Sequence, residues 1–149
     1  MARHPKGMTM MSNERLVRVQ WGDCDPAGIV YYPRYFAWAD DSTLLLFEKA
    51  TGIKKIEMLR RHGGAGIALL EAHAVFKVAS EYGDDLTVAS RVTEFRRSVF
   101  KVEHRFTKGE GVLALEVHET RLWTVRDPLT GRIKSGDMPA EVIAAFGAP

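Results

Sequence analysis

The sequence predicts an α+β fold in which an antiparallel sheet curls around one long central helix. Residues 14–21 alternate between apolar and polar side chains, as expected of a strand with one buried face. Residues 33–50 carry apolar side chains at three- and four-residue spacing, which is typical of an amphipathic helix. Four β-rich segments follow within residues 67–125. A single helix between strands can bury its apolar stripe only against the concave face of a curled sheet.

The first strand is expected over residues 14–21, because its apolar side chains share one side. These residues are Val17, Val19 and Trp21. Residues 1–13 show no period, so we expect a flexible N-terminal leader there. Residues 14–149 are expected to form a single domain, since a chain of 149 residues with 46% apolar content suits one core.

The long helix is expected to begin at Pro33, since proline favours the first helical position, and to end before Gly52. Its apolar stripe consists of Phe36, Ala39, Leu46 and Phe47, with Tyr35, Trp38 and Leu45 beside them. A short helical turn is expected over residues 54–61. The glycines of residues 63–66 then indicate a bend or a close approach of the backbone.

The second half of the chain has the two-residue period of strands. Strands are predicted over residues 67–78, 86–95, 99–107 and 112–125, joined as an antiparallel meander. Turn residues lie between these segments and after the last of them, at residues 81–84, 96–98, 108–111 and 127–131. A short helix over residues 138–146 completes the predicted fold.

Composition excludes several classes of function. The formal net charge is only +2 and no block of five like charges occurs, which argues against binding to nucleic acid or to a membrane surface. The longest apolar run is far shorter than the roughly 20 residues that span a bilayer. The lone cysteine, Cys24, cannot form an internal disulfide, and no signal-peptide core is found near the start, so we expect a cytoplasmic protein.

No metal site is expected, because the histidines lack close ligand spacing and the chain has one cysteine. Cys24 is expected to be buried and inert, since no local histidine accompanies it to form a reactive thiolate.

The segment Gly22-Asp23-Cys24-Asp25-Pro26-Ala27-Gly28 places a constrained carboxylate shortly before the predicted helix. Pro26 favours an extended conformation for Asp25, and the glycines permit unusual backbone angles, so the loop can fix the direction of one acid. The first N–H groups of the helix have no intrahelical partner and suit an oxyanion. Taken alone, an Asp-x-Asp pair in such a loop is more often a turn or a helix cap.

The residues 22–30, followed by Tyr32-Pro33, Tyr35, Trp38 and Asp40, resemble the active-site loop and helix start of the acyl-CoA thioesterases of the hot-dog fold. The resemblance is strongest to the 4-hydroxybenzoyl-CoA thioesterase group. Weaker likeness at residues 82–87, 94–97 and 138–140 extends it over most of the chain from about Arg15. It implies a five-stranded antiparallel sheet wrapped around the central helix, and protomers that assemble as a homodimer or homotetramer.

The resemblance also implies catalytic roles. Asp25 would act on the thioester carbonyl, either as a nucleophile or as the base for a water, while Asp23 would support the loop. The backbone N–H of Tyr32 would polarise the carbonyl. A thioester suits such a site, because its thiolate leaves without strong acid help. No cofactor is expected, since coenzyme A is part of the acyl-CoA substrate.

Four residues are candidates for substrate binding. The resemblance places Asp40 towards the acyl pocket, although Asp40 could equally face solvent on the helix. Arg96 stands where the family binds the nucleotide with an arginine, Arg97 lies beside it, and Lys134 replaces a family arginine. Cations of this kind suit the phosphates of coenzyme A, but solvated surface charges explain all three as well. The family's next residues, Lys-Ser, are Ser98-Val99 here.

The expected function is hydrolysis of a small acyl-CoA, aromatic and 4-hydroxybenzoyl-like or short-chain. The alternatives are a thioesterase for acyl groups on acyl carrier protein and a non-catalytic acyl-CoA-binding protein of the same fold. Residues 67–71 are less polar than the matching residues of the family member that acts on an aromatic acyl group, so the identity of the acyl group stays open.

Overall fold

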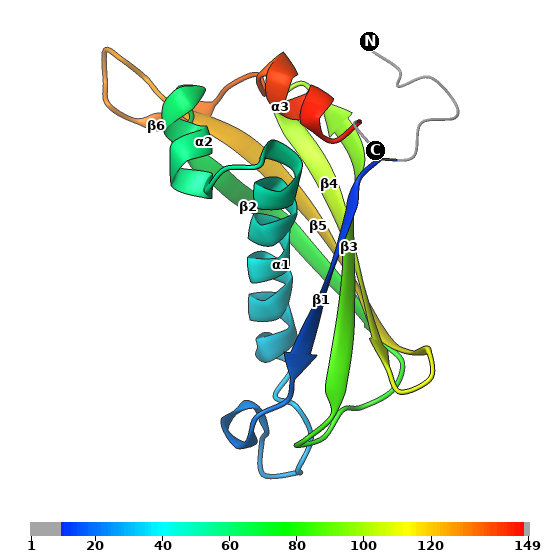
Figure 1. Ribbon diagram of the computed structural model, residues 1–149. Coiled ribbons are helices and arrows are strands. Elements are labelled where there is room, and N and C mark those ends of the chain that lie inside the picture. Colours follow the sequence, from blue (N-terminus) through cyan, green and yellow to red (C-terminus); the bar gives the residue numbers. More distant parts are fainter. Residues whose placement is uncertain (1–9, 148–149) are drawn as a thin grey trace.

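Helix α1 (Pro33–Thr51) lies across the concave face of a curved antiparallel sheet (Figure 1). The computed structural model describes residues 10–147. Pro33 occupies the first turn of α1, and Gly52 ends the helix in the left-handed conformation at φ 73°, which a glycine adopts without strain. The predicted α+β class, with a sheet wrapped around one long helix, is therefore confirmed.

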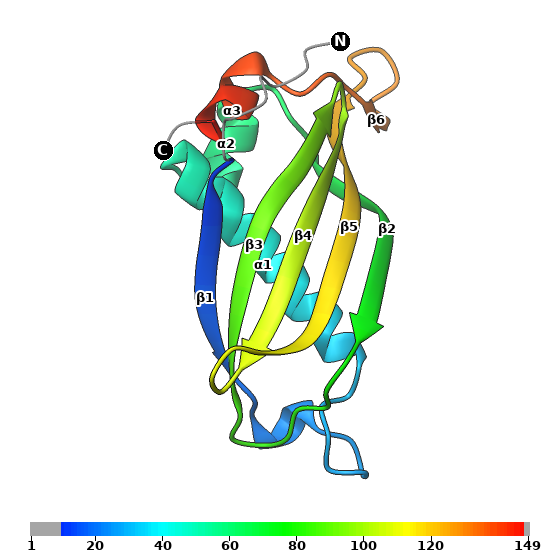
Figure 2. The same cartoon turned by 90° about the vertical axis from the view of Figure 1, so that its right-hand side faces the viewer.

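The main sheet has the strand order β1-β3-β4-β5-β2, and all neighbours are antiparallel (Figure 2). The strands are β1 (Ser12–Arg18), β2 (Gly66–Phe76), β3 (Asp85–Arg96), β4 (Val99–Lys108) and β5 (Val112–Arg126). A short strand that the sequence did not predict, β6 (Ile133–Ser135), pairs with β5.

The predicted meander is right for β3, β4 and β5 but wrong for β2. The chain crosses the concave face as α1 after β1 and then enters the sheet at the far edge, so β2 pairs with β5 and not with β3. Register shifts interrupt three of the strand pairs, and such bulges increase the local twist that curves a sheet.

The shorter helices also match the prediction. They are α2 (Lys55–Arg61) and α3 (Ala140–Ala145). A β-carbon built on Gly64 would lie 2.4 Å from Cζ2 of Trp123, so the predicted close approach of the glycine segment is confirmed. The backbone at Gly64 and the ring of Trp123 can lie this close only because glycine has no side chain.

The first strand differs from the prediction at both ends. It ends at Arg18, because Trp21–Asp23 form a single 3-10 turn (η1). It begins at Ser12, within the expected leader, and the N–H of Met11 donates to the carbonyl of Phe146 at 2.8 Å. The remainder of the expected leader, residues 1–9, lies outside the described residues.

The buried face of α1 is apolar at its two ends and polar in the middle. Ala39, Leu46 and Phe47 are buried, as predicted, but so are Ser42 and Thr43. The core forms two separate clusters. One contains Tyr35, near the N-terminal end of α1, and the other contains Phe47, near its C-terminal end. The polar stretch between them faces a group of charged side chains on the sheet.

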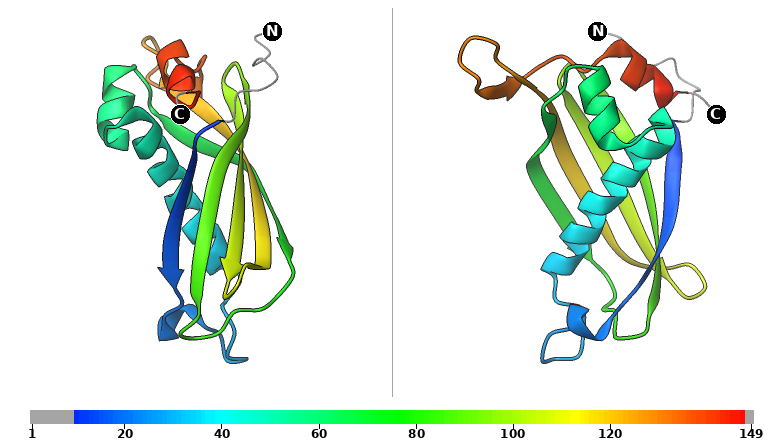
Figure 3. Two further views of the ribbon diagram at one scale, coloured as in Figure 1. Left: turned by 45° about the vertical axis from the view of Figure 1, so that its right-hand side comes forward. Right: turned by 60° about the vertical axis from the view of Figure 1, so that its left-hand side comes forward.

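The two ends of the molecule carry different loops. The segment between β1 and α1 lies at one end together with the β2–β3 loop, and the β3–β4 turn, β6 and α3 lie at the other (Figures 1 and 3). The predicted catalytic residues are therefore at one end of the sheet and the predicted nucleotide-binding residues at the other.

Candidate active site

The loop before α1 is closed by its own backbone. Cys24 and Val30 form an antiparallel bridge, the N–H of Asp25 donates to the carbonyl of Ile29 at 2.9 Å, and the N–H of Gly28 donates back to the carbonyl of Asp25 at 2.9 Å. Gly28 has φ 81°, a conformation that side chains rarely tolerate. A second bridge, from Ile29 to Glu81, fastens this loop to the β2–β3 loop.

Asp25 is half-buried within this loop and is held by one carboxylate oxygen. Oδ1 accepts a hydrogen bond from the N–H of Ala27 at 2.8 Å, an Asx-turn geometry that fixes the side chain on its own backbone. Within residues 10–147 the other oxygen has no hydrogen-bond or ion-pair partner. Asp25 is thus a fixed carboxylate with one oxygen left for a ligand.

Asp23 has the loop-supporting contacts expected of it. Its Oδ2 accepts from the N–H of Gln20 at 2.8 Å, and its carbonyl accepts from the N–H of Tyr31 at 2.8 Å. Its Oδ1 lies 3.8 Å from Nε of Arg34 on α1, so the same residue joins the loop to the helix. Cys24 is half-buried, with its sulfur 3.8 Å from the carbonyl of Gln20.

Tyr32 supplies a free main-chain donor at the start of α1. It occupies the N-cap position, no side chain caps the helix, and the backbone N–H of Tyr32 has no acceptor among the described residues. The neighbouring N–H of Tyr31 is already used by Asp23. The unpaired N–H groups at a helix start carry partial positive charge, so this position favours a negatively charged oxygen.

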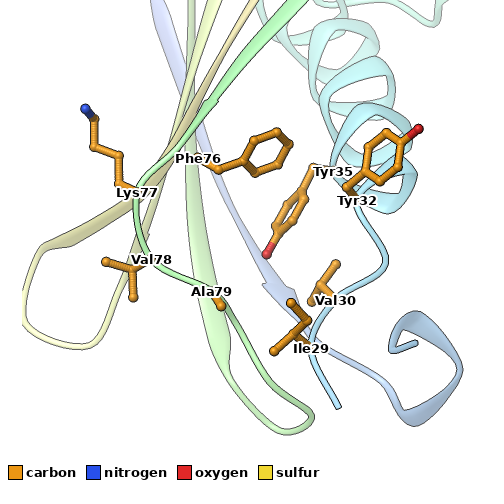
Figure 4. Close-up of a pocket in the computed structure, with 8 residues that line it drawn as sticks. All are labelled: Ile29, Val30, Tyr32, Tyr35, Phe76, Lys77, Val78 and Ala79. Atoms are coloured by element: carbon orange, nitrogen blue, oxygen red, sulfur yellow. The ribbon is translucent and has the colours of Figure 1, made fainter. Parts of the chain in front are cut away.

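An apolar pocket of about 310 Å³ adjoins Tyr32 (Figure 4). Phe76 of β2 and Tyr35 of α1 point towards one another, with ring centroids 5.8 Å apart, while the Lys77 ammonium points away (Figure 4). Burial raises the pKa of the Tyr35 phenol, which therefore stays protonated. The full lining is Ile29, Val30, Tyr32, Tyr35, Phe76, Lys77, Val78 and Ala79.

A cluster of buried polar side chains lies between the middle of α1 and the sheet, and the sequence did not predict it. Nε2 of His104 is 2.8 Å from Oε1 of Glu119, and Nδ1 is 2.6 Å from Oγ of Ser90. Because a carboxylate only accepts, Nε2 of His104 donates to Glu119, while the other ring nitrogen pairs with the Ser90 hydroxyl. Thr43 of α1 donates to the same oxygen of Glu119 at 2.5 Å.

Arg121 extends this cluster to Asp40. Its Nη2 donates to Oε2 of Glu119 at 2.5 Å and to Oδ1 of Asp40 at 2.6 Å. Burial alone would raise the pKa of Glu119, but hydrogen bonds from His104 and Arg121, with their charge, lower it from 4.5 to about 2. Burial would lower the pKa of Arg121, but Glu119 and Asp40 raise it. Both groups are therefore ionised at neutral pH.

Asp40 forms an ion pair with the buried Arg121, whereas the sequence left open whether it faces the acyl pocket or solvent. The Asp40 side chain is 66% exposed, whereas that of Arg121 is 5% exposed.

A sequence signal for the buried polar cluster existed, because the two-residue period of β5 places Glu119 and Arg121 on the same face as the buried Val117 and Trp123.

The basic residues that were predicted to bind coenzyme A lie on the surface, at the end of the sheet opposite the Asp25 loop. Arg96 is 3.3 Å from Glu94, Arg97 is 3.6 Å from Asp137, and Lys134 is 3.2 Å from Asp127. Arg97 has φ 53° in the β3–β4 turn. Because β3 has twelve residues, about 40 Å separate its two ends. A single chain therefore does not bring Arg96 to Asp25.

The fold and the loop together indicate the class of hot-dog thioester hydrolases, and comparison with known proteins leads to the same class. The thioesterase-like superfamily model matches residues 19–146, so the chain belongs to this superfamily.

Among curated proteins, the chain is 29% identical over 130 residues to the 4-hydroxybenzoyl-CoA thioesterase of Pseudomonas sp. strain CBS-3, covering 85% of this chain and 91% of that one. It is 28% identical over 139 residues to the acyl-CoA thioester hydrolase YbgC of Escherichia coli, covering 87% and 92%.

Among solved structures, a mutant 4-hydroxybenzoyl-CoA thioesterase complexed with 4-hydroxybenzoyl-CoA matches with a TM-score of 0.83 and 28% identity over 91% of this chain and 98% of that one. A gentisyl-coenzyme A thioesterase matches with a TM-score of 0.76 and 27% identity over 90% and 99%.

Within residues 10–147, no helix is long and apolar enough to cross a membrane. No group of three or more His, Cys, Asp or Glu side chains in these residues is arranged to hold a metal ion.

The ionised state of Glu119 predicts a specific loss of stability in acid. Its pKa is lowered in the folded chain, so its contribution is present above the ordinary value of 4.5 and is lost as the pH falls towards about 2. Ionised Glu119 contributes roughly 3 kcal/mol to the free energy of unfolding at neutral pH. We expect Glu119→Gln to be less stable than wild type at pH 7 and to lose less stability between pH 5 and pH 2, as measured by urea unfolding.

The matched control is Glu116→Gln on the outer face of the same strand, where Glu116 pairs with the half-exposed Arg105. This variant should follow the wild-type profile. Parallel profiles for wild type and Glu119→Gln would contradict the assignment of a depressed pKa to Glu119.

Proposed function

We propose that this protein hydrolyses small acyl-CoA thioesters, with an aromatic 4-hydroxybenzoyl-like or a short-chain acyl group, to the free acid and coenzyme A. The observation that carries the proposal is the free N–H of Tyr32 at the helix start, beside an apolar pocket and in the same closed loop region as the half-anchored Asp25. Relatives named as thioesterases of aromatic acyl-CoA support the choice of substrate.

The proposed chemistry begins with the thioester carbonyl bound at the start of α1. Its oxygen accepts the N–H of Tyr32, and the helix dipole stabilises the negative charge that develops on that oxygen. The free oxygen of Asp25 then either attacks the carbonyl carbon, which gives a mixed anhydride that water cleaves to the free acid, or takes the proton of a water that attacks the carbon directly. The thiolate leaves without a strong acid, so these residues need no cofactor.

Three further residues are assigned to the acyl group. The apolar walls of the pocket, Phe76 and Tyr35, bury its hydrocarbon part. Asp40 lies two helical turns beyond Tyr32, about 12 Å along the axis of α1, and we assign it to the far end of the acyl group.

We also propose that two copies pair along β2. This strand is an edge of the sheet, and within the described residues no strand covers its outer side. Leu69, Leu70 and Phe76 on it are each more than half exposed. Long apolar edges invite strand pairing, so a homodimer, on which a homotetramer can be built, protects this edge.

Dimer formation would bring together the two halves of the binding site. If the β2 strands pair antiparallel about a twofold axis, the end of one copy that carries Arg96 is turned towards the Asp25 end of the other. One copy would then supply the catalytic loop, and the other would supply Arg96, Arg97 and Lys134 for the phosphates of coenzyme A. We propose the cytoplasm as the location, where acyl-CoA is available and a lone cysteine stays reduced.

The first test is the substitution Asp25→Asn. It keeps the shape of the side chain and removes the charged oxygen, so we expect kcat to fall by at least about a hundredfold with KM nearly unchanged. Thiol release from a panel of aromatic and aliphatic acyl-CoAs measures both. The matched control, Asp41→Asn, alters a carboxylate on the exposed side of α1 and should retain full activity. Near-normal turnover in Asp25→Asn would refute the mechanism.

Binding of unchanged acyl-CoA without thiol release by the wild type would instead identify a non-catalytic binding protein. Faster hydrolysis of thioesters on acyl carrier protein than on coenzyme A would redirect the proposal to the carrier-bound substrate.

The second test concerns Arg96. If its guanidinium binds the nucleotide equally in the ground and transition states, Arg96→Ala should raise KM several-fold and leave kcat within about twofold. Arg105→Ala is the control, because this arginine lies on the outer face of the sheet in a similar exposed ion pair. Equal KM values in the two variants would leave Arg96 as an ordinary surface charge.

The third test concerns the β2 edge. Leu70→Glu places a charge at the bulge of this strand, so we expect a monomer by analytical ultracentrifugation and loss of most hydrolysis. Leu129→Glu, at an exposed leucine in the β5–β6 loop, should change neither mass nor rate. A wild type that is monomeric and active would rule out the paired site.

A further inference from the structure

We infer that Thr43 is a positioning residue for the reaction, because its hydroxyl fixes α1 on the sheet and so holds the N–H of Tyr32 where the thioester oxygen would bind. The inference rests on the proposed function, and the proposed chemistry makes no use of Thr43. Its side chain is buried between the helix and the sheet, so it acts through α1 and not by touching the substrate.

The Thr43 hydroxyl is held between two side chains of the sheet. It donates to Oε1 of Glu119 on β5 at 2.5 Å, and it lies 3.0 Å from Nε2 of His104 on β4. Both strands are interior strands of the sheet, and both side chains are buried. Hydrogen bonds tolerate only small changes of distance and angle. An oxygen with two such neighbours therefore has one place relative to the sheet.

The buried polar groups of the sheet do not need this hydroxyl. Glu119 accepts from His104 through Oε1 at 2.8 Å and from Arg121 through Oε2 at 2.5 Å. The other ring nitrogen of His104 pairs with Ser90 at 2.6 Å. Both carboxylate oxygens and both ring nitrogens thus have partners on β3, β4 and β5. The bond from Thr43 joins a network that is already complete, and what it fixes is the position of α1.

The apolar contacts of α1 define its position less sharply. Tyr35 and Phe47 belong to separate apolar clusters near the two ends of the helix. Hydrophobic attraction has no preferred direction, and apolar cores lose a unique arrangement before they lose stability. Buried polar contacts are one means of restricting a core to a single arrangement. Besides Thr43, the middle of α1 has a second such contact, from Nε of Arg15 on β1 to Ser42 at 2.8 Å.

The position of α1 matters because the helix carries the main-chain donor at its start. Thr43 follows Tyr32 by 11 residues, about 16 Å along the axis, and no glycine or proline interrupts the helix between Pro33 and Gly52. A shift of the helix at Thr43 is therefore passed on to Tyr32. A donor to a developing oxyanion must lie about 2.7–3.1 Å from it, and a misplacement of about 1 Å can lower a rate about a hundredfold.

The experiment compares two substitutions of Thr43 by thiol release from the best acyl-CoA substrate of the wild type. Thr43→Val removes the hydroxyl and keeps the branched shape, whereas Thr43→Ser keeps the hydroxyl and removes a methyl group. Both should be less stable than wild type, the first because a charged oxygen loses a donor and the second because a cavity forms. We expect kcat to fall at least about tenfold in Thr43→Val, with KM within about twofold, and to stay within about twofold in Thr43→Ser.

A control on the same helix separates positioning from general support of the fold. The Thr51 hydroxyl donates to the carbonyl of Phe47 within α1 at 2.8 Å, and among the described residues it bonds to no side chain of the sheet. Thr51→Val should therefore keep the wild-type kcat. Urea unfolding shows whether each variant is folded under the assay conditions. If Thr43→Val does not fold, Thr43→Ala, which places no methyl group against Glu119, takes its place with the same expectation.

The outcomes are distinct. A loss of kcat in Thr43→Val that Thr43→Ser does not share supports the inference. A wild-type kcat in Thr43→Val, with or without a change of KM, would overturn it and leave the proposed function untouched. Losses of kcat in the two variants that follow their losses of stability would overturn it as well. A wild type that releases no thiol from any acyl-CoA would refute the proposed function together with this inference.

Discussion

The packing of α1 against the concave face of the sheet fixes the positions of Tyr32, of the loop before the helix and of Asp40. The helix is held at both ends by apolar clusters around Tyr35 and Phe47, and in the middle by the hydrogen bond from Thr43 to Glu119. Because the helix cannot slide or rotate in this setting, its first free N–H stays beside the pocket and the loop before it stays closed. The geometry at Tyr32 is thus a consequence of contacts made along the whole helix.

Much of this fold could be predicted because local signals coincide with physical boundaries. Pro33 and Gly52 mark the ends of α1, and the two-residue period identifies β2 to β5. The order of the strands could not be predicted, because the period of a strand carries no information about its neighbour. Trp21 continued the alternation of the first strand and yet belongs to a 3-10 turn, since alternation alone does not show where a sheet ends.

The candidate site, like the fold, could be predicted from the sequence only in part. The loop around Asp25 could be predicted because its constraints are local, residing in neighbouring glycines and a proline. The pair of Asp40 and Arg121 could not, because its members are 81 residues apart in the chain and meet only after β5 is placed beneath α1. Arg121 and Glu119 stand at inward positions of β5, where charges are rare unless they are paired. That unusual placement was the available clue.

The anchoring of Asp25 by a single oxygen also bears on how a reaction cycle would close. Under the proposed mechanism, hydrolysis of a thioester would form a carboxylate beside Asp25, one oxygen of which is held by the N–H of Ala27. Two negative groups at close range in a weakly screened pocket repel one another. The loop that would help to cleave an incoming neutral ester would therefore also help to expel the anion left behind, so that little of the acid accumulates on the protein.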